Sequence, residues 1–237
     1  MGGSIFERIE KKYIITDEQY DALQKYLSLH CVPDEFPDSY IYNIYYDTDD
    51  DRIVRDSAGK PIYKEKLRLR AYALPKDDTK VFVELKKKFK GVVYKRRIML
   101  PYKDAVAFLN EGIPPKERTQ IVREIEYFMN YYKGIRPAMF ISYHRLSYIS
   151  TDGTASRITF DSEITYRTDD LLIDKGIYGL PLLEEGTRLM ELKILGSMPL
   201  WLSNALDECK VFPTTFSKFG TAHNALLIKQ LDLEGAI

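Results

Sequence analysis

The sequence has few of the residues that build disulfide or metal-bound frameworks. Its 237 residues include only 2 cysteines, 3 histidines and 1 tryptophan. Cys31 and Cys209 form no pair with metal-ligand spacing, and two cysteines are too few for a disulfide scaffold. This usage is typical of a reducing compartment, so we expect a cytoplasmic protein.

Net charge and long apolar runs are also missing. The chain has 35 lysines and arginines against 35 aspartates and glutamates, a formal net charge of +0. A protein that coats polyanions without selectivity would be strongly basic, so an electropositive function here requires local sorting of charge. No apolar stretch is long enough to span a bilayer, and the N-terminus lacks the apolar region of a signal peptide. We therefore expect no membrane segment in this chain.

The apolar content of the chain is 45%, which is enough to form a core. Its 18 tyrosines are typical of a protein rich in strands. Alternating patterns predict strands at residues 6–16, 39–48, 62–74, 80–90, 92–100, 138–149, 156–162 and 187–195. Helical spacing predicts helices at residues 16–30, 102–110, 114–132 and 199–209, with a short final helix. Thr16 or Asp17 is the expected N-cap of the first helix, and Pro115 is expected in the first turn of the third.

No internal repeat or linker interrupts this order. We therefore predict a single domain over residues 1–237 of the α+β class, an eight-stranded antiparallel β-barrel with flanking helices. About eight strands is the size at which a closed barrel can enclose a small ligand.

Charged residues recur at every second position of nearly every predicted strand. Because successive side chains of a strand point to opposite faces, residues two apart share a face. These shared faces carry Arg8, Glu10 and Lys12; Lys66, Arg68 and Arg70; Glu84, Lys86 and Lys88; Lys95 and Arg97; Tyr143 and Arg145; and Glu191 and Lys193. A sheet with one face in water produces such alternation routinely. The predominance of lysine and arginine instead favours a lumen for a phosphate chain, with the few carboxylates available for a divalent metal.

An ordered set of motifs resembles a known family. The segments FERIEKKYII, LRLRAY, VFVELKKK, YKRR, ISYHRLSY, RITFD, LMELKIL and FSKFG are similar to those of the VTC (vacuolar transporter chaperone) polyphosphate polymerase domain. That domain belongs to the triphosphate tunnel metalloenzymes, together with CYTH-type triphosphatases. The resemblance covers essentially the whole chain. It implies an eight-stranded tunnel and metal-dependent transfer of the ATP γ-phosphate onto a growing polyphosphate chain.

The resemblance also implies roles for individual residues. The catalytic set it suggests is Lys12, Arg68, Arg70, Lys86 and Glu191, with Glu191 holding Mn²⁺ or Mg²⁺. The phosphate and polyphosphate ligands it suggests are Arg8, Lys95, Arg97, Arg145, Lys193, Ser217 and Lys218. The implied partners are ATP and pyrophosphate or polyphosphate, with a membrane partner protein as an option. Nucleic acid is not expected, because the basic strands lack a cluster of aromatic side chains on which bases could stack.

One position departs from the wider superfamily. Its triphosphatases begin with E-x-E-x-K, whereas this chain reads Arg8-x-Glu10-x-Lys12, which replaces a metal ligand with a phosphate ligand. That counts against a plain triphosphatase, but three alternatives stay open: a polymerase, a tunnel triphosphatase, and a polyphosphate-binding module without catalysis.

Several charged residues have simpler interpretations. Glu10 and Glu84 are expected to pair with neighbouring lysines. For Asp161 two roles are equally expected, a carboxylate that supports residues of the site or the cap of a turn. Lys87, Lys90 and Arg96 have the opposite strand parity and are expected in solvent. The run DTDDDR at residues 47–52 lacks the closing glutamate of a calcium loop, so a turn is predicted.

Overall fold

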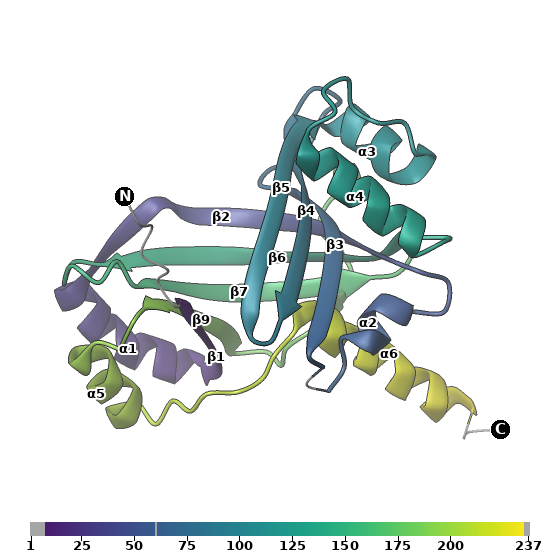
Figure 1. Ribbon diagram of the computed structural model, residues 1–237. Coiled ribbons are helices and arrows are strands. Elements are labelled where there is room, and N and C mark those ends of the chain that lie inside the picture. Colours follow the sequence, from purple (N-terminus) through teal and green to yellow (C-terminus); the bar gives the residue numbers. More distant parts are fainter. Residues whose placement is uncertain (1–7, 60, 235–237) are drawn as a thin grey trace. The chain divides into compact units, whose positions relative to one another are not determined.

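The computed structural model describes residues 8–59 and 61–234. Within these ranges the chain forms nine strands, six α-helices and one 3-10 helix, which confirms the α+β class (Figure 1). The strands are β1 Arg8–Thr16, β2 Cys31–Asp47, β3 Tyr63–Ala71, β4 Lys80–Phe89, β5 Val92–Pro101, β6 Arg136–Ser150, β7 Arg157–Arg167, β8 Leu180–Pro181 and β9 Thr187–Leu195. The helices are α1 Asp17–His30, α2 Arg52–Asp56, α3 Tyr102–Glu111, α4 Gln120–Tyr131, α5 Leu200–Glu208 and α6 Lys218–Glu234, with the 3-10 helix at Ile173–Lys175.

The strands are hydrogen-bonded in the order β1-β9-β7-β6-β2-β3-β4-β5, with β8 beside β7. All pairings with a described register are antiparallel. Among the described residues, β1 and β5 end this order and do not pair with each other. The sheet is therefore not closed, and the predicted eight-stranded barrel is not confirmed.

The chain divides into two compact units, each assembled from three segments. The first unit comprises residues 1–40, 143–164 and 183–216, and the second comprises residues 41–142, 165–182 and 217–237. Three strands, β2, β6 and β7, contribute residues to both. Whether residues 1–237 act as one domain stays a prediction.

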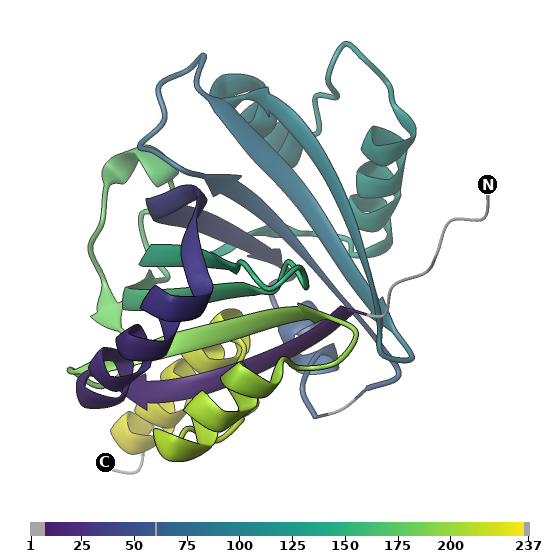
Figure 2. The same cartoon turned by 90° about the vertical axis from the view of Figure 1, so that its left-hand side faces the viewer.

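In the first unit, helices α1 and α5 cover one face of the sheet. Tyr13 of β1, Phe160 of β7 and Leu192 of β9 are buried in the same core as Leu23 of α1 and Leu202 of α5. β1 and β9 lie side by side next to these helices (Figure 2). Burying this apolar face leaves the alternate residues of the same strands on the other side.

The second unit repeats this design with other elements. Leu67 and Leu69 of β3 and Val83 of β4 are buried together with Phe108 of α3 and Ile125 of α4. Figure 1 shows α3 and α4 lying along β4 and β5. In both units, the predicted separation of an apolar, helix-covered face from a charged face is present.

The helix boundaries differ from the prediction at two places. The helix predicted over residues 114–132 begins only at Gln120, because the Thr119 hydroxyl accepts the backbone N–H of Val122 at 3.3 Å and caps α4 there. Pro115 is therefore outside the helix. The final helix is longer than predicted and begins at Lys218, after the Ser217 hydroxyl accepts the backbone N–H of Gly220 at 3.2 Å. The N-cap of α1 is Thr16, which forms a capping box with Gln19.

Candidate functional site: two charged clusters

The charged face of the first unit is built by strand register. Antiparallel pairing places Lys12 of β1 opposite Glu191 of β9, and Glu10 opposite Lys193. On its other side, β9 pairs Glu191 with Thr159 of β7. Paired residues share a face of the sheet, so charges far apart in the sequence become neighbours.

Four residues from β1, β6, β7 and β9 form the first cluster: Lys12, Arg145, Asp161 and Glu191. The two oxygens of the Glu191 carboxylate face different cations, Lys12 Nζ at 3.4 Å and an Arg145 guanidinium nitrogen at 3.5 Å. Arg145 also donates two hydrogen bonds to the fully buried Asp161, at 2.5 and 2.7 Å. Burial opposes the charge of Arg145, but the Asp161 carboxylate raises the pKa of Arg145 well above its usual value. Asp161 therefore positions Arg145 and does not cap a turn.

Lys12 is fixed by a further contact. Its ammonium group donates to the backbone carbonyl of Phe216 at 3.0 Å, and it lies 3.8 Å from Glu10. The backbone of Lys12 pairs with Thr214. The FSKF motif thus starts next to the first strand, although nothing in the spacing of the sequence relates the two.

The charged face of the second unit comes from four strands in register. Arg68 of β3 lies opposite Glu84 of β4, and Glu84 lies opposite Arg97 of β5. Tyr45 of β2 lies on the other side of Arg68. One step along, Lys86 is paired with Lys66 and with Lys95. This face therefore gathers cations from β3, β4 and β5 around few acids.

Six residues form the second cluster: Tyr45, Arg68, Arg70, Glu84, Lys95 and Arg97. The Glu84 carboxylate, 1% exposed, lies within 4 Å of all four cations. Arg68 and Lys95 are closest, at 2.6 and 2.7 Å, while Arg70 and Arg97 lie at 3.9 Å. Glu84 is a salt-bridge partner, as predicted, but three of the four cations within 4 Å of it are arginines, and the fourth is Lys95 of the neighbouring strand β5.

The electrostatics of Glu84 reflect these partners. Burial alone would raise the pKa of Glu84, but Arg68, Arg70 and Lys95 more than offset this and lower it to about 2. Among the described residues, the single negative charge of Glu84 faces four cations within 4 Å.

The phenol of Tyr45 lies in the field of the same arginines. It is nearly fully buried, which would raise its pKa, yet Arg68, Arg70 and Lys66 lower the pKa of Tyr45 to about 8. Arg68 donates to the Tyr45 hydroxyl at 3.1 Å. The pKa of a buried phenol is lowered only where the electrostatic field of nearby groups favours a negative charge. Sequence analysis missed Tyr45, because only the register between β2 and β3 brings it to Arg68.

Sequence analysis also left three neighbours of the second cluster without a role. Asn43 accepts a hydrogen bond from Arg70 at 2.9 Å, and Lys66 donates to the Ser217 hydroxyl at 2.8 Å. Phe219 stacks on Tyr45, with ring centroids 4.8 Å apart. Ser217 and Lys218 therefore stand at the start of α6, next to this charged face, and Lys218 is 8% exposed.

The remaining predicted site residues are placed only by register or exposure. Lys86 is exposed between Lys66 and Lys95, and Lys193 is half-buried between Glu10 and Arg157. For Arg8 the structure describes the backbone, paired with Leu195 in β1 and β9. The first and second clusters belong to different units, so the twelve predicted residues fall into two groups.

Across the described part of the chain, no three histidine, cysteine, aspartate or glutamate side chains gather into a metal-binding group. Glu191 offers hard oxygen donors of the kind that Mg²⁺ and Mn²⁺ prefer, but both its oxygens face cations. A metal on Glu191 would need further oxygen ligands from a substrate and water, as is common for Mg²⁺.

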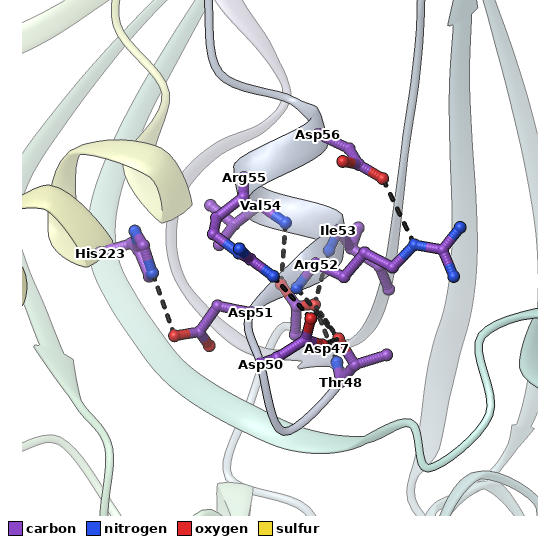
Figure 3. Close-up of polar contacts among 10 residues, drawn as sticks. All are labelled: Asp47, Thr48, Asp50, Asp51, Arg52, Ile53, Val54, Arg55, Asp56 and His223. Carbon is purple, nitrogen blue, oxygen red and sulfur yellow. Dashed lines mark hydrogen bonds and ion pairs between the residues drawn. The ribbon is translucent and has the colours of Figure 1, made fainter.

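The acidic run at residues 47–52 is not a calcium loop but a turn that leads into α2 (Figure 3). The Asp47 carboxylate accepts the backbone N–H groups of Thr48, Ile53 and Val54 at 2.8 to 2.9 Å. Asp50 pairs with Arg55, and Asp51 faces His223 at 3.2 Å. These carboxylates are used to cap the helix and to pair with side chains, which confirms the predicted turn.

Cations of the opposite parity have local partners. Lys87 lies 3.9 Å from Glu65, and Arg96 pairs with Glu124 of α4 at 3.0 Å. Lys90 is exposed at the turn between β4 and β5. Of these three, Lys87 departs from the prediction of a solvated side chain, because it is largely covered.

Comparison with protein families decides the membership of the chain. The model of the VTC domain matches residues 7–227. The chain belongs to the VTC domain family. No curated protein matches the sequence. Within the described ranges, no helix combines the length and the apolarity required to cross a bilayer.

Two solved structures share this fold over most of the chain. A protein from Hippeastrum, proposed to be an adenylyl cyclase and reported to have a dominant triphosphatase activity, matches with a TM-score of 0.57 and 15% identity. That match covers 92% of this chain and 96% of the other. A protein from Bacillus halodurans, also proposed to be an adenylate cyclase, matches with a TM-score of 0.54 and 14% identity, over 89% of this chain and 93% of the other. At 14% and 15% identity, these similarities establish a shared fold and nothing beyond it.

Proposed function

We propose that this VTC domain is a metal-dependent polyphosphate polymerase that transfers the γ-phosphate of ATP onto a growing polyphosphate chain. The observation that carries the proposal is the second cluster, in which four cations surround the single carboxylate of Glu84. A chain of phosphates is opposite in charge to these cations, and guanidinium groups can bind it through paired hydrogen bonds.

The exposed members of the second cluster are the ones best suited to meet a phosphate chain. The side chains of Lys95 and Arg97 are each 45% exposed, whereas Arg70 is almost fully buried. Lys95 and Arg97 can turn from Glu84 toward an arriving phosphate. The aromatic face of Phe82, 4.3 Å from the Arg97 guanidinium, supports Arg97 in this position.

Within this proposal, the residues take the roles that family membership suggests. Arg68, Arg70, Lys86 and Lys12 bind the triphosphate of ATP. The acceptor or product chain is bound by Arg8, Lys95, Arg97, Arg145, Lys193, Ser217 and Lys218. Arg145 has the least freedom of these, because Asp161 holds it through two hydrogen bonds.

Glu191 is the proposed ligand of Mn²⁺ or Mg²⁺. When bound, such an ion neutralises charge on the phosphate oxygens that it contacts. A metal on Glu191 would compete with Lys12 and Arg145 for the Glu191 carboxylate.

The proposed reaction needs no side-chain nucleophile. A terminal phosphate oxygen of the acceptor attacks the γ-phosphorus of ATP, and the bond from that phosphorus to the bridging β,γ-oxygen breaks. ADP leaves with the electron pair of the broken bond, and the acceptor chain is longer by one phosphate. Positioning and charge neutralisation supply most of the rate in such transfers.

A tunnel triphosphatase is the second candidate, because the Hippeastrum protein of the same fold has a dominant triphosphatase activity. Water would then replace the acceptor phosphate. Arg8 at the start of the R-x-E-x-K segment counts against this candidate, because it replaces the first acid of the triphosphatase pattern. A module that binds polyphosphate without turnover is the third candidate.

The products formed from ATP test the proposal. Purified protein is incubated with ATP and Mn²⁺, with and without pyrophosphate as a primer, and the products are resolved on a gel. We expect long phosphate chains, and we expect Glu191→Ala to abolish them while circular dichroism shows an intact fold. Orthophosphate as the sole product would support the triphosphatase, and tight polyphosphate binding without turnover would support the binding module. Full turnover by Glu191→Ala would overturn the metal assignment.

A further inference from the structure

An apolar tip closes the hairpin of β4 and β5 in the second unit. Four of its side chains form what we call the tip patch, Phe89, Val92, Val93 and Tyr94, and they are 45%, 54%, 46% and 49% exposed. Phe89 pairs with Val92, and Tyr94 pairs with Lys87, so three members share one face of the hairpin. Val93 pairs with Lys88 on the opposite face. The tip is therefore apolar and exposed on both faces.

The helices that cover the apolar face of this sheet do not reach the tip. Val83 and Leu85 of β4 are fully buried in the core with α3 and α4, and Ile98 and Leu100 of β5 pack against it. Farther along the same strands, Phe89, Val92 and Tyr94 lose this cover. Exposed apolar side chains gathered at one place mark an interaction site more often than isolated ones do.

The turn holds the tip patch in a defined shape. Lys90 and Gly91 both have positive φ, 48° and 87°, as in the two-residue turns that fit the twist of a hairpin. The backbone N–H of Lys90 also donates to the carbonyl of Ile62 at 2.9 Å. Ile62, 68% exposed, extends the apolar surface from the neighbouring segment.

Basic residues surround the tip patch. Lys87, Lys88, Lys90 and Lys95 flank its four apolar side chains, and Arg96 follows. The chain has no aspartate or glutamate between Glu84 and Asp104. Lys88 and Lys90 are exposed. Apolar side chains flanked by the exposed Lys88 and Lys90 match the surface of an anionic bilayer, in which the acyl region lies beneath negatively charged headgroups.

We propose that the tip patch docks on the surface of an anionic lipid bilayer. A second copy of the chain fits less well, because two such tips would bring lysines against lysines. A flat protein surface would cover one face of the hairpin and leave Val93 or Phe89 in water. Nucleic acid would satisfy the lysines but not the aliphatic Val92 and Val93. The inference does not depend on the proposed polymerase activity.

Sedimentation with lipid vesicles tests this inference on the full chain. Vesicles of phosphatidylcholine are compared with vesicles that also contain phosphatidylserine. We expect binding to the anionic vesicles only, weakened by added salt because screening reduces the attraction of lysines to headgroups. Phe89→Asp and Val93→Asp should each lower the partition coefficient by about tenfold or more, since each loses apolar burial and adds a repelled charge.

Leu29→Asp is the matched control, because Leu29 is an apolar residue of α1 that is 76% exposed. It makes the same change of charge at a residue outside the tip patch and should reduce binding far less. Three results would overturn the inference: no binding by the wild-type protein, equal binding to neutral and anionic vesicles, or the same loss in Leu29→Asp as in Phe89→Asp. Self-association of the wild-type protein without vesicle binding would assign the tip patch to a second copy instead.

Discussion

At the scale of single residues, Glu84 determines how the basic face of the second unit is held together. Four cations lie within 4 Å of its carboxylate. Removing that charge would leave the cations facing one another. We expect Glu84→Gln to destabilise the fold by about 3 to 5 kcal/mol, the usual cost of breaking a buried ion pair by removing one partner. Urea denaturation measures this directly.

Glu124→Gln is the control for this change. Glu124 pairs with Arg96 near the surface, where an ion pair contributes less than about 1 kcal/mol. The two variants should therefore differ clearly in their urea midpoints. If Glu84→Gln is as stable as Glu124→Gln, then Glu84 does not organise the second cluster.

The pKa of Glu84 also predicts how stability depends on pH. Its pKa is about 2 in the folded protein, against a value near 4.5 in the unfolded chain. The stabilisation from the ionised carboxylate is therefore complete above about pH 4.5 and is lost as the pH falls toward 2. Urea midpoints measured across this window should fall less steeply in Glu84→Gln than in the wild-type protein.

Tyr45 offers a direct probe of the positive field. Its pKa of about 8 predicts that one tyrosine ionises well before the others, which phenolate absorbance can follow during a titration. Tyr45→Phe should remove that step. Inorganic triphosphate should raise the pKa of Tyr45, because a bound anion cancels part of the field of Arg68 and Arg70. An early ionisation that survives in Tyr45→Phe would assign it to a different group.

At the scale of elements, the start of α4 distinguishes between two sequence signals for the beginning of a helix, a capping hydroxyl and a proline. Thr119 caps the helix through its hydroxyl, whereas Pro115 precedes it. Thr119→Ala should destabilise the protein by about 1 kcal/mol, the usual cost of losing such a cap. Pro115→Ala should have a much smaller effect, because no helical turn depends on it. Equal losses of thermal stability in the two variants would contradict this boundary.

The elements also show what the sequence could predict. Strict alternation in β3, β4 and β9 predicted both the strands and their charged faces, because an apolar face must be buried. The extension of β2 back to Cys31 was missed, since Pro33 and Pro37 disfavour strand structure. Short α2 was also missed, because its five residues form around hydrogen bonds to Asp47 that no periodicity reveals.

Pairings between distant strands explain the rest of what was missed. The parity of Glu84 with Lys86 placed it on the charged face, but only the register with β3 and β5 brings Arg68 and Arg97 to it. Tyr45 and Phe219 meet although 174 positions separate their numbers in the sequence. Local patterns cannot specify such pairs, because register depends on how whole strands pack.

At the scale of the whole molecule, a net charge of zero coexists with a strongly basic face. The two are compatible because strand alternation sorts the charges: cations gather on one face of the second unit, and the balancing acids lie elsewhere. The net charge alone would therefore not identify such a protein as one that binds polyanions. The arginines at positions 96 and 97 illustrate the sorting, since they are adjacent in sequence and point to opposite faces of β5.

These two arginines provide the most direct test that the basic face binds a phosphate chain. Their side chains are 44% and 45% exposed, so their loss removes the same charge with similar accessibility. Calorimetric titration with inorganic triphosphate compares wild type, Arg97→Ala and Arg96→Ala. The account predicts binding that is weakened about tenfold or more in Arg97→Ala, because a hydrogen bond to a charged group is lost, and that is nearly unchanged in Arg96→Ala. Equal affinities in the two variants, or no binding by the wild-type protein, would contradict it.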